Sequence, residues 1–106
     1  MKSGFVTAGG HRLEYQLIPA HQINRPTLVL LHEGLGSVAM WRDFPSRLAH
    51  ATGCRTLVYS RYGYGQSDLL EAPFGTDYMH IEGRDTLPQL LAALEIENPV
   101  LVGHSD

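Results

Sequence analysis

The segment Gly103-His104-Ser105-Asp106 holds the side chain best suited to nucleophilic chemistry. It follows the apolar run Val100-Leu101-Val102, which predicts a buried strand. A serine on a sharp turn after such a strand would match the start of a G-x-S-x-G nucleophile elbow, which exposes the serine hydroxyl at the end of a sheet. The short motif also arises by chance, as an ordinary turn that ends a strand. Upstream residues must decide between the two interpretations.

A second candidate segment is His32-Glu33-Gly34-Leu35-Gly36, directly after the apolar residues 27–31. Glycines let the backbone pass close to a ligand and expose its amide groups. Acyl transfer requires donors directed at the oxygen that gains negative charge, and backbone N–H groups are fixed in place before the reaction. The segment therefore predicts an oxyanion-binding loop, and the alternative is a plain strand-to-helix turn that needs glycine.

A third glycine-rich segment, residues 60–68, follows the apolar residues 56–59. It contains neither the lysine of a phosphate-binding P-loop nor the three-glycine spacing of a dinucleotide site. A structural loop is predicted here.

The elements that must position these segments alternate along the chain. Residues 5–8 and 13–17 flank Gly9-Gly10, a pair typical of a tight hairpin turn, so the chain is expected to open with an antiparallel hairpin. Residues 27–31, 56–59 and 100–102 are continuously apolar, as in strands buried on both faces of a parallel sheet. Helical patterns separate these strands, which predicts a wound α/β sheet with flanking helices.

Two prolines complicate the helical patterns. The first helix is expected to begin near Pro45, with Asp43 as its N-terminal cap, a preliminary turn before it and Gly53 at its C-terminus. The second is expected from about Asp77, with a kink or break at Pro88. The apolar positions expected to face the core are Val38, Trp41, Phe44, Leu48 and Ala51 in the first pattern, and Leu87, Leu90, Leu91 and Leu94 in the second.

Composition excludes several classes of function. The 106 residues are 43% hydrophobic with a formal charge of −3, which predicts one globular domain over residues 1–106. There is no basic cluster for nucleic acid, no apolar run of the ~20 residues that span a bilayer, and no leader segment, so the expected location is cytoplasmic. The six histidines show no H-E-x-x-H spacing, and we expect no metal site and no cofactor. Cys54 is expected to be a buried structural thiol.

Taken in order, the hairpin, the two loops and the elbow resemble the amino-terminal part of the α/β-hydrolase superfamily over essentially the whole chain. The resemblance implies a serine hydrolase in which Ser105 is the nucleophile and the backbone N–H groups of Gly34 and Asp106 bind the oxyanion. Its small-molecule substrate would be an ester or a related carbonyl compound, although carbon–carbon bond hydrolases and cofactor-free peroxidases share the serine arrangement. Supporting residues of the two loops would be His32, Glu33, Gly36, Gly103 and His104, and the apolar substrate pocket would include Met40, Trp41 and Tyr62. For Trp41, core packing is the alternative.

Two features depart from the family pattern. Glu33 stands where many relatives have glycine, and its carboxylate is expected to point away from the oxyanion. The family's acid and histidine base follow the serine, so residues 1–106 alone are expected to be an inactive, incomplete domain. The alternative is a non-catalytic interaction fragment whose exposed last strand binds a partner, or a second copy, by strand addition.

Overall fold

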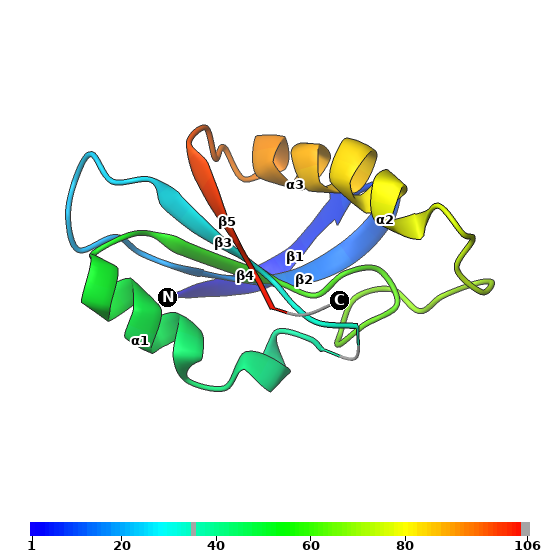
Figure 1. Cartoon of the computed structure of the whole chain (residues 1–106), viewed down its shortest axis with the longest axis horizontal. Helices are drawn as coiled ribbons and strands as arrows, with labels where there is room; N and C mark the ends of the chain where they lie inside the picture. The colour runs from blue at the N-terminus through cyan, green and yellow to red at the C-terminus, as the bar shows by residue number, and fades with distance from the viewer. Residues whose placement is uncertain (35, 105–106) are drawn as a thin grey trace.

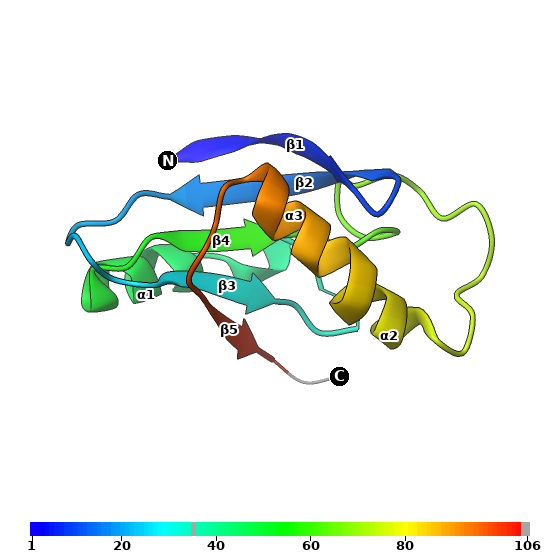
Figure 2. The ribbon, with the colours of Figure 1, turned by 90° about the horizontal axis from the view of Figure 1, so that it is seen from above.

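Within the described residues, the chain forms a five-stranded mixed sheet with helices on both faces (Figures 1 and 2). The computed structural model describes residues 1–34 and 36–104. The strands lie in the order β1-β2-β4-β3-β5. In chain order the elements are β1 Lys2–Ala8, β2 His11–Ile18, β3 Thr27–Leu31, the 3-10 turn η1 Ala39–Trp41, α1 Phe44–Thr52, β4 Thr56–Tyr59, α2 Tyr78–Ile81, the π-helical turn η2 Glu82–Thr86, α3 Leu87–Ala93 and β5 Pro99–Gly103.

The opening hairpin is confirmed. Gly9 and Gly10 turn the chain with φ angles of +61° and +80°, and β1 pairs antiparallel with β2. A Cβ on Gly9 would lie 2.4 Å from Thr86 Oγ1, and the Gly9 N–H donates to Gln89 Oε1 at 2.8 Å. Glycine at this turn therefore permits both the left-handed backbone and the close packing of the hairpin on η2 and α3.

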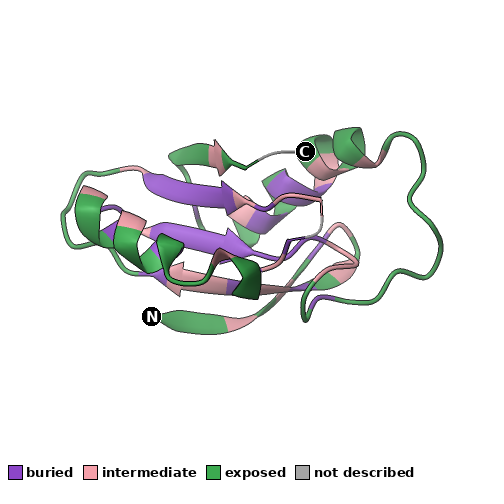
Figure 3. Cartoon of the chain, turned by 60° about the horizontal axis from the view of Figure 1, so that its bottom comes forward, coloured by how far each residue is buried: buried purple, intermediate pink, exposed green. Residues whose placement is uncertain are grey.

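The parallel part of the sheet lies at its centre. β3 pairs with β4 on one side and with β5 on the other, both in parallel, whereas β2 pairs with β4 in antiparallel orientation. Figure 3 shows that β3 and β4 are buried, as their continuous apolar sequences predicted. β5 lies at an edge of the sheet, and Val100 and Leu101 on it are 44% and 51% exposed.

The first helical pattern was only partly correct. α1 begins at Phe44 and ends in a left-handed Gly53, as expected, but Asp43 makes no side-chain capping hydrogen bond. The preliminary turn is η1, and Arg42 after it has a φ angle of +55°, which separates η1 from α1. The helical period does not continue across that break, so Pro45 and Ala49 are buried in α1, whereas Phe44 and Ala51 are exposed.

The break expected in the second pattern is a π-helical turn. η2 lies between α2 and α3 and ends two residues before Pro88, which stands in the first turn of α3. Because proline lacks an N–H, it fits at the start of a helix better than inside one. Leu87 and Leu90 are buried beneath α3 as expected. No described helix has the length and apolar character needed to cross a membrane.

The two faces of the sheet have separate cores. Val29 and Leu57 pack with Leu90 on the α3 face, and Leu28 and Val58 pack with residues on the α1 face, because successive residues of a strand point to opposite sides. The chain passes from β3 to β4 through α1 and from β4 to β5 through α3 on the opposite face (Figure 1). The winding therefore reverses between β3 and β5, and in open α/β sheets ligands bind at the carboxyl ends of strands at such a point.

Candidate active site

The carboxyl ends of β3 and β5 lie side by side. Leu31 is paired with Gly103, and the N–H of His104 donates to the carbonyl of Leu31 at 3.2 Å. This pairing brings the glycine-containing loop after β3 next to the residue that precedes Ser105. Ser105 and Asp106, like Leu35, lie outside the described residues. Gly34 lies in the turn closed by a hydrogen bond from the Gly36 N–H to the Glu33 carbonyl at 2.9 Å.

His32 is 4% exposed and connects this loop to the end of β4. Its Nε2 accepts the backbone N–H of Arg61 at 3.0 Å, and its Nδ1 lies 2.6 Å from the carbonyl oxygen of Glu33. Because Nε2 faces the N–H of Arg61 and Nδ1 faces a carbonyl oxygen, we assign the proton of the neutral ring to Nδ1. The ring of Tyr64 contacts the same imidazole in a T-shaped arrangement, with 4.9 Å between ring centroids. The imidazole thus shapes the loop from inside the protein.

Arg61 is a member of the site that sequence reasoning did not identify. Its guanidinium is buried, and Nη2 donates to the carbonyls of His32 at 3.1 Å and of Glu33 at 3.3 Å. Its guanidinium and its backbone N–H thus hold the loop after β3 from the side of β4. The sequence signal that could have identified it is a cation two residues after a predicted buried strand. An arginine buried at such a place needs several hydrogen-bond acceptors, and the carbonyls of a neighbouring loop can provide them.

The Glu33 side chain does not point away from the site. Its Oε2 lies 3.2 Å from Nδ1 of His104, and its Oε1 would lie only 2.7 Å from a Cβ placed on Gly36. The Glu33 side chain is 37% exposed to solvent and the His104 side chain is 62% exposed. The carboxylate therefore bridges the loop after β3 and the end of β5.

Two of the three predicted pocket residues lie together. Met40 and Trp41 line a cavity of about 350 Å³ with Glu33, Phe44, Val102, Gly103 and His104. Trp41 also packs against the α1-face core, which was the alternative considered from sequence, and its role in a substrate pocket stays a prediction. Its buried indole N–H has no hydrogen-bond partner among the described residues.

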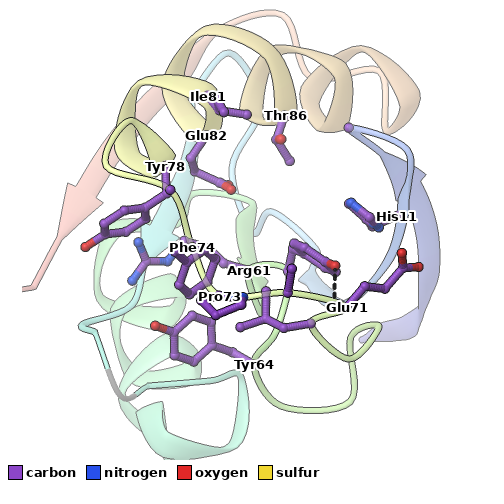
Figure 4. Close-up of a pocket in the computed structure, with 15 residues that line it drawn as sticks. His11, Arg61, Tyr64, Glu71, Pro73, Phe74, Tyr78, Ile81, Glu82 and Thr86 are labelled. Carbon is purple, nitrogen blue, oxygen red and sulfur yellow. Dashed lines mark hydrogen bonds between the residues drawn. The ribbon is translucent and has the colours of Figure 1, made fainter.

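Tyr62 lies elsewhere, in a separate cavity of about 420 Å³ shown in Figure 4. Its ring stacks on His11 with 3.6 Å between centroids, and its hydroxyl accepts the backbone N–H of Glu71 at 3.0 Å. The loop after β4 turns back toward the opening hairpin, and this carries Tyr62 away from Met40 and Trp41. The structure therefore does not bring the three predicted pocket residues together.

Residues 60–68 form the structural loop that was predicted. Ser60 Oγ donates to Glu14 Oε1 at 2.6 Å and accepts the N–H of Val38 at 2.8 Å, and Ser67 Oγ donates to the Ser60 carbonyl at 2.7 Å. The loop is thus bonded both to β2 and to the start of η1. Cys54 is buried, as expected.

A partly buried ionisable pair, Tyr59 and Glu82, lies beside the site. The Tyr59 hydroxyl donates to Glu82 Oε2 at 2.5 Å, and Glu82 lies on η2 in the wall of the Tyr62 cavity (Figure 4). Burial raises the pKa of Glu82, against the lowering effects of the Tyr59 hydrogen bond and of Arg61. Burial and the Glu82 charge raise the pKa of Tyr59. Among residues 1–34 and 36–104, no group of three or more His, Cys, Asp or Glu could hold a metal ion.

Comparison with known proteins places this geometry in a family. Residues 26–105 match the family model described as the alpha/beta hydrolase fold. No curated protein sequence matches.

Three similar solved structures show how much of a relative the chain covers. Proline iminopeptidase from Mycobacterium smegmatis has a TM-score of 0.79 at 27% identity, over 97% of this chain and 35% of that one. A hydrolase from Pseudomonas aeruginosa has a TM-score of 0.73 at 25% identity, over 95% of this chain and 36% of that one. Epoxide hydrolase VrEH1 from Vigna radiata has a TM-score of 0.76 at 22% identity, over 98% of this chain and 32% of that one. The chain thus spans about a third of the length of these relatives, and it belongs to the α/β-hydrolase family.

Proposed function

We propose that this chain carries the nucleophile and the oxyanion-binding loop of a serine hydrolase that acts on an ester or a related carbonyl compound. The observation that supports this most directly is the pairing of β3 with β5, which sets the loop containing Gly34 beside Gly103 and His104 at the winding reversal. Ser105 is the next residue in the sequence. The site therefore combines a candidate nucleophile with candidate backbone donors.

In the proposed reaction the Ser105 hydroxyl attacks the substrate carbonyl, and a histidine base accepts its proton. The amides of Gly34 and Asp106 stabilise the negative oxygen of the tetrahedral intermediate. Collapse of that intermediate releases the alcohol and leaves an acyl-enzyme, which water hydrolyses. In the chain order of this family the acid and the histidine follow the serine, so the activity is proposed for the complete enzyme, and residues 1–106 alone are expected to be a poor catalyst.

The fold alone does not select this chemistry. The similar structures include an epoxide hydrolase, a haloalkane dehalogenase, an enol-lactonase and a proline iminopeptidase. Relatives that form an alkyl-enzyme ester use aspartate as the nucleophile, whereas this chain has serine at the elbow position, followed by Asp106. We therefore favour acyl transfer to serine. The cavity beside Met40 and Trp41 would accept an apolar acyl group.

A fluorophosphonate, which reacts with activated serines, tests the proposal. The protein expressed from its natural coding sequence should be labelled once, and peptide mapping should locate the label on Ser105. Ser105→Ala should abolish labelling, and Ser46→Ala, which changes an exposed serine of α1, should leave it intact. Labelling that persists in Ser105→Ala, or that is absent from the natural protein, would contradict the proposal. The intact mass of that protein shows whether one polypeptide also supplies the base and the acid.

A second candidate function, binding of a partner or a second copy by strand addition, is favoured by the exposure of Val100 and Leu101 on the edge strand β5. Sedimentation velocity over a hundredfold range of concentration tests it. Concentration-dependent assembly should be lost in Leu101→Lys and kept in Leu69→Lys, a matched change at an exposed loop leucine. This candidate would be contradicted if the protein is a monomer at every concentration and also binds no added partner strand along β5.

A further inference from the structure

We infer that Glu33 and His104 are positioning residues that hold the start of the proposed oxyanion loop, at His32 and Glu33, against Gly103 and His104 at the start of the proposed nucleophile elbow. We also infer that the His104 N–H offsets the negative charge of the Glu33 carboxylate at the site. The inference rests on the proposed function, because it assigns these residues a part in the same reaction. It explains why a carboxylate can stand beside the place where an oxyanion must form.

The geometry shows one side chain in contact with both segments. Glu33 Oε2 lies 3.2 Å from His104 Nδ1, while its Oε1 would lie 2.7 Å from a Cβ placed on Gly36. A carboxylate can only accept hydrogen bonds, so the contact requires a proton on Nδ1 of His104. His104 is itself bound to β3 through its N–H and the Leu31 carbonyl. The pair therefore connects the two strand ends beyond the last rung of the sheet.

The main chain of Glu33 is held firmly enough to direct this side chain. Its carbonyl oxygen accepts the Gly36 N–H at 2.9 Å and lies 2.6 Å from His32 Nδ1 and 3.3 Å from Arg61 Nη2. Because His32 and Arg61 are buried, the position of this carbonyl depends on the protein interior and not on solvent. A shift of the Glu33 side chain would therefore act on the elbow rather than be absorbed by a loose loop.

The charge of the carboxylate has a definite expected effect. Glu33 lines the cavity that also contains Gly103 and His104, and Gly34 is its neighbour in the chain. A negative charge near the oxyanion disfavours the transition state, and an N–H donor directed at that charge reduces its effect. Removing His104 should therefore slow the reaction more than removing both members of the pair.

The test compares four variants by the kinetics of fluorophosphonate inactivation, which separates the maximal rate constant from the affinity for the reagent. His104→Ala should lower the maximal rate constant about tenfold with little change in affinity. Glu33→Gln keeps an oxygen acceptor for the His104 N–H but removes the charge that disfavours the oxyanion, so it should react faster than the wild type. The double variant Glu33→Gln/His104→Ala should recover most of the loss. Glu97→Gln, at an exposed carboxylate, is the matched control.

A double variant that reacts as slowly as His104→Ala, or more slowly, would overturn the charge-offset part of the inference, since a purely structural role gives no recovery. The pair itself has a readout that does not need activity. In long-range ¹H–¹⁵N NMR spectra, the His104 ring should show a proton on Nδ1 in the wild type and lose that preference in Glu33→Ala. A neutral ring with its proton on Nε2 would overturn the pair. If Ser105 is not labelled at all, the proposed function fails while this spectrum still tests the contact.

Discussion

The Nε2 atom of His32 accepts the backbone N–H of Arg61 at 3.0 Å, which joins the first residue after β3 to the second residue after β4. The imidazole takes the place of a sheet hydrogen bond where the two parallel strands have already ended. Because the same ring contacts the Glu33 carbonyl through Nδ1, it fixes the start of the loop after β3, the proposed oxyanion loop, relative to the sheet. The loop is thus positioned by a side chain that is itself buried in the protein.

His32→Ala should destabilise the fold by about 1–3 kcal/mol, because it leaves the buried N–H of Arg61 without this acceptor. Urea unfolding followed by circular dichroism measures the change. His80→Ala, at an exposed histidine of α2, is the matched control and should change stability by less than about 0.5 kcal/mol. Equal effects of the two substitutions would show that the His32–Arg61 hydrogen bond contributes nothing.

Gly65→Ala should be strongly destabilising for two reasons that act together. Gly65 has a φ angle of +52°, and a Cβ there would lie 2.4 Å from Glu14 Oε1 and 2.5 Å from Ser60 Oγ. Strain and the displaced hydrogen bond are expected to cost about 1–3 kcal/mol, or more if Ser60 loses its partner. In Gly83→Ala the new Cβ meets open space on a helical turn, so that variant should be neutral or slightly more stable. Differential scanning calorimetry of the two proteins compares them directly.

The sequence predicted the sheet well because local chemistry decides most of it. Continuous apolar runs located β3, β4 and β5 to within one residue at each end, and Gly9-Gly10 located the hairpin turn. The α/β-hydrolase fold followed from the order of these pieces and is confirmed by the family match. Each of these signals is carried by neighbouring residues, so no knowledge of distant contacts was required.

Contacts between distant segments could not be predicted in the same way. The Glu33–His104 contact and the Arg61 hydrogen bonds to the loop depend on β3 lying between β4 and β5, which no local pattern encodes. Tyr62 was assigned to the pocket of Met40 and Trp41 because all three are apolar and near the candidate loops. Its actual position follows from stacking on His11 of the opening hairpin, a contact across about fifty residues of sequence. The predicted roles of Ser105 and Asp106 remain predictions.

Trp41→Phe should cost little stability although Trp41 packs against the core. The indole N–H is buried without a hydrogen-bond partner among the described residues. Phenylalanine removes that group while it keeps most of the ring contact with Phe44 and of the packing against the α1-face core. We expect a loss below about 1 kcal/mol for Trp41→Phe and about 2–4 kcal/mol for Trp41→Ala, because the latter opens a cavity. Urea unfolding of both variants measures the difference. Equal losses would mean that the N–H has a partner after all.

Glu82→Gln should change how stability depends on pH. Burial raises the pKa of Glu82 in the folded state above its ordinary value of 4.5, so the native protein binds this proton more tightly than the unfolded chain does. Between 4.5 and the raised value, stability therefore falls as pH increases. Glutamine keeps an oxygen for the Tyr59 hydroxyl but has no proton to lose, so it removes this contribution.

The free energy of unfolding of Glu82→Gln, relative to the wild type, should accordingly increase as the pH rises above 4.5, and should level off once the pH exceeds the raised pKa of Glu82. Urea unfolding at half-unit intervals of pH measures the two curves, and Glu97→Gln at an exposed position should run parallel to the wild type. If the Glu82→Gln curve instead falls relative to the wild type as pH rises, the ionised Glu82 is stabilised by Arg61 and Tyr59 more than burial disfavours it. The sign of that difference therefore decides which of the opposing effects on this carboxyl is larger.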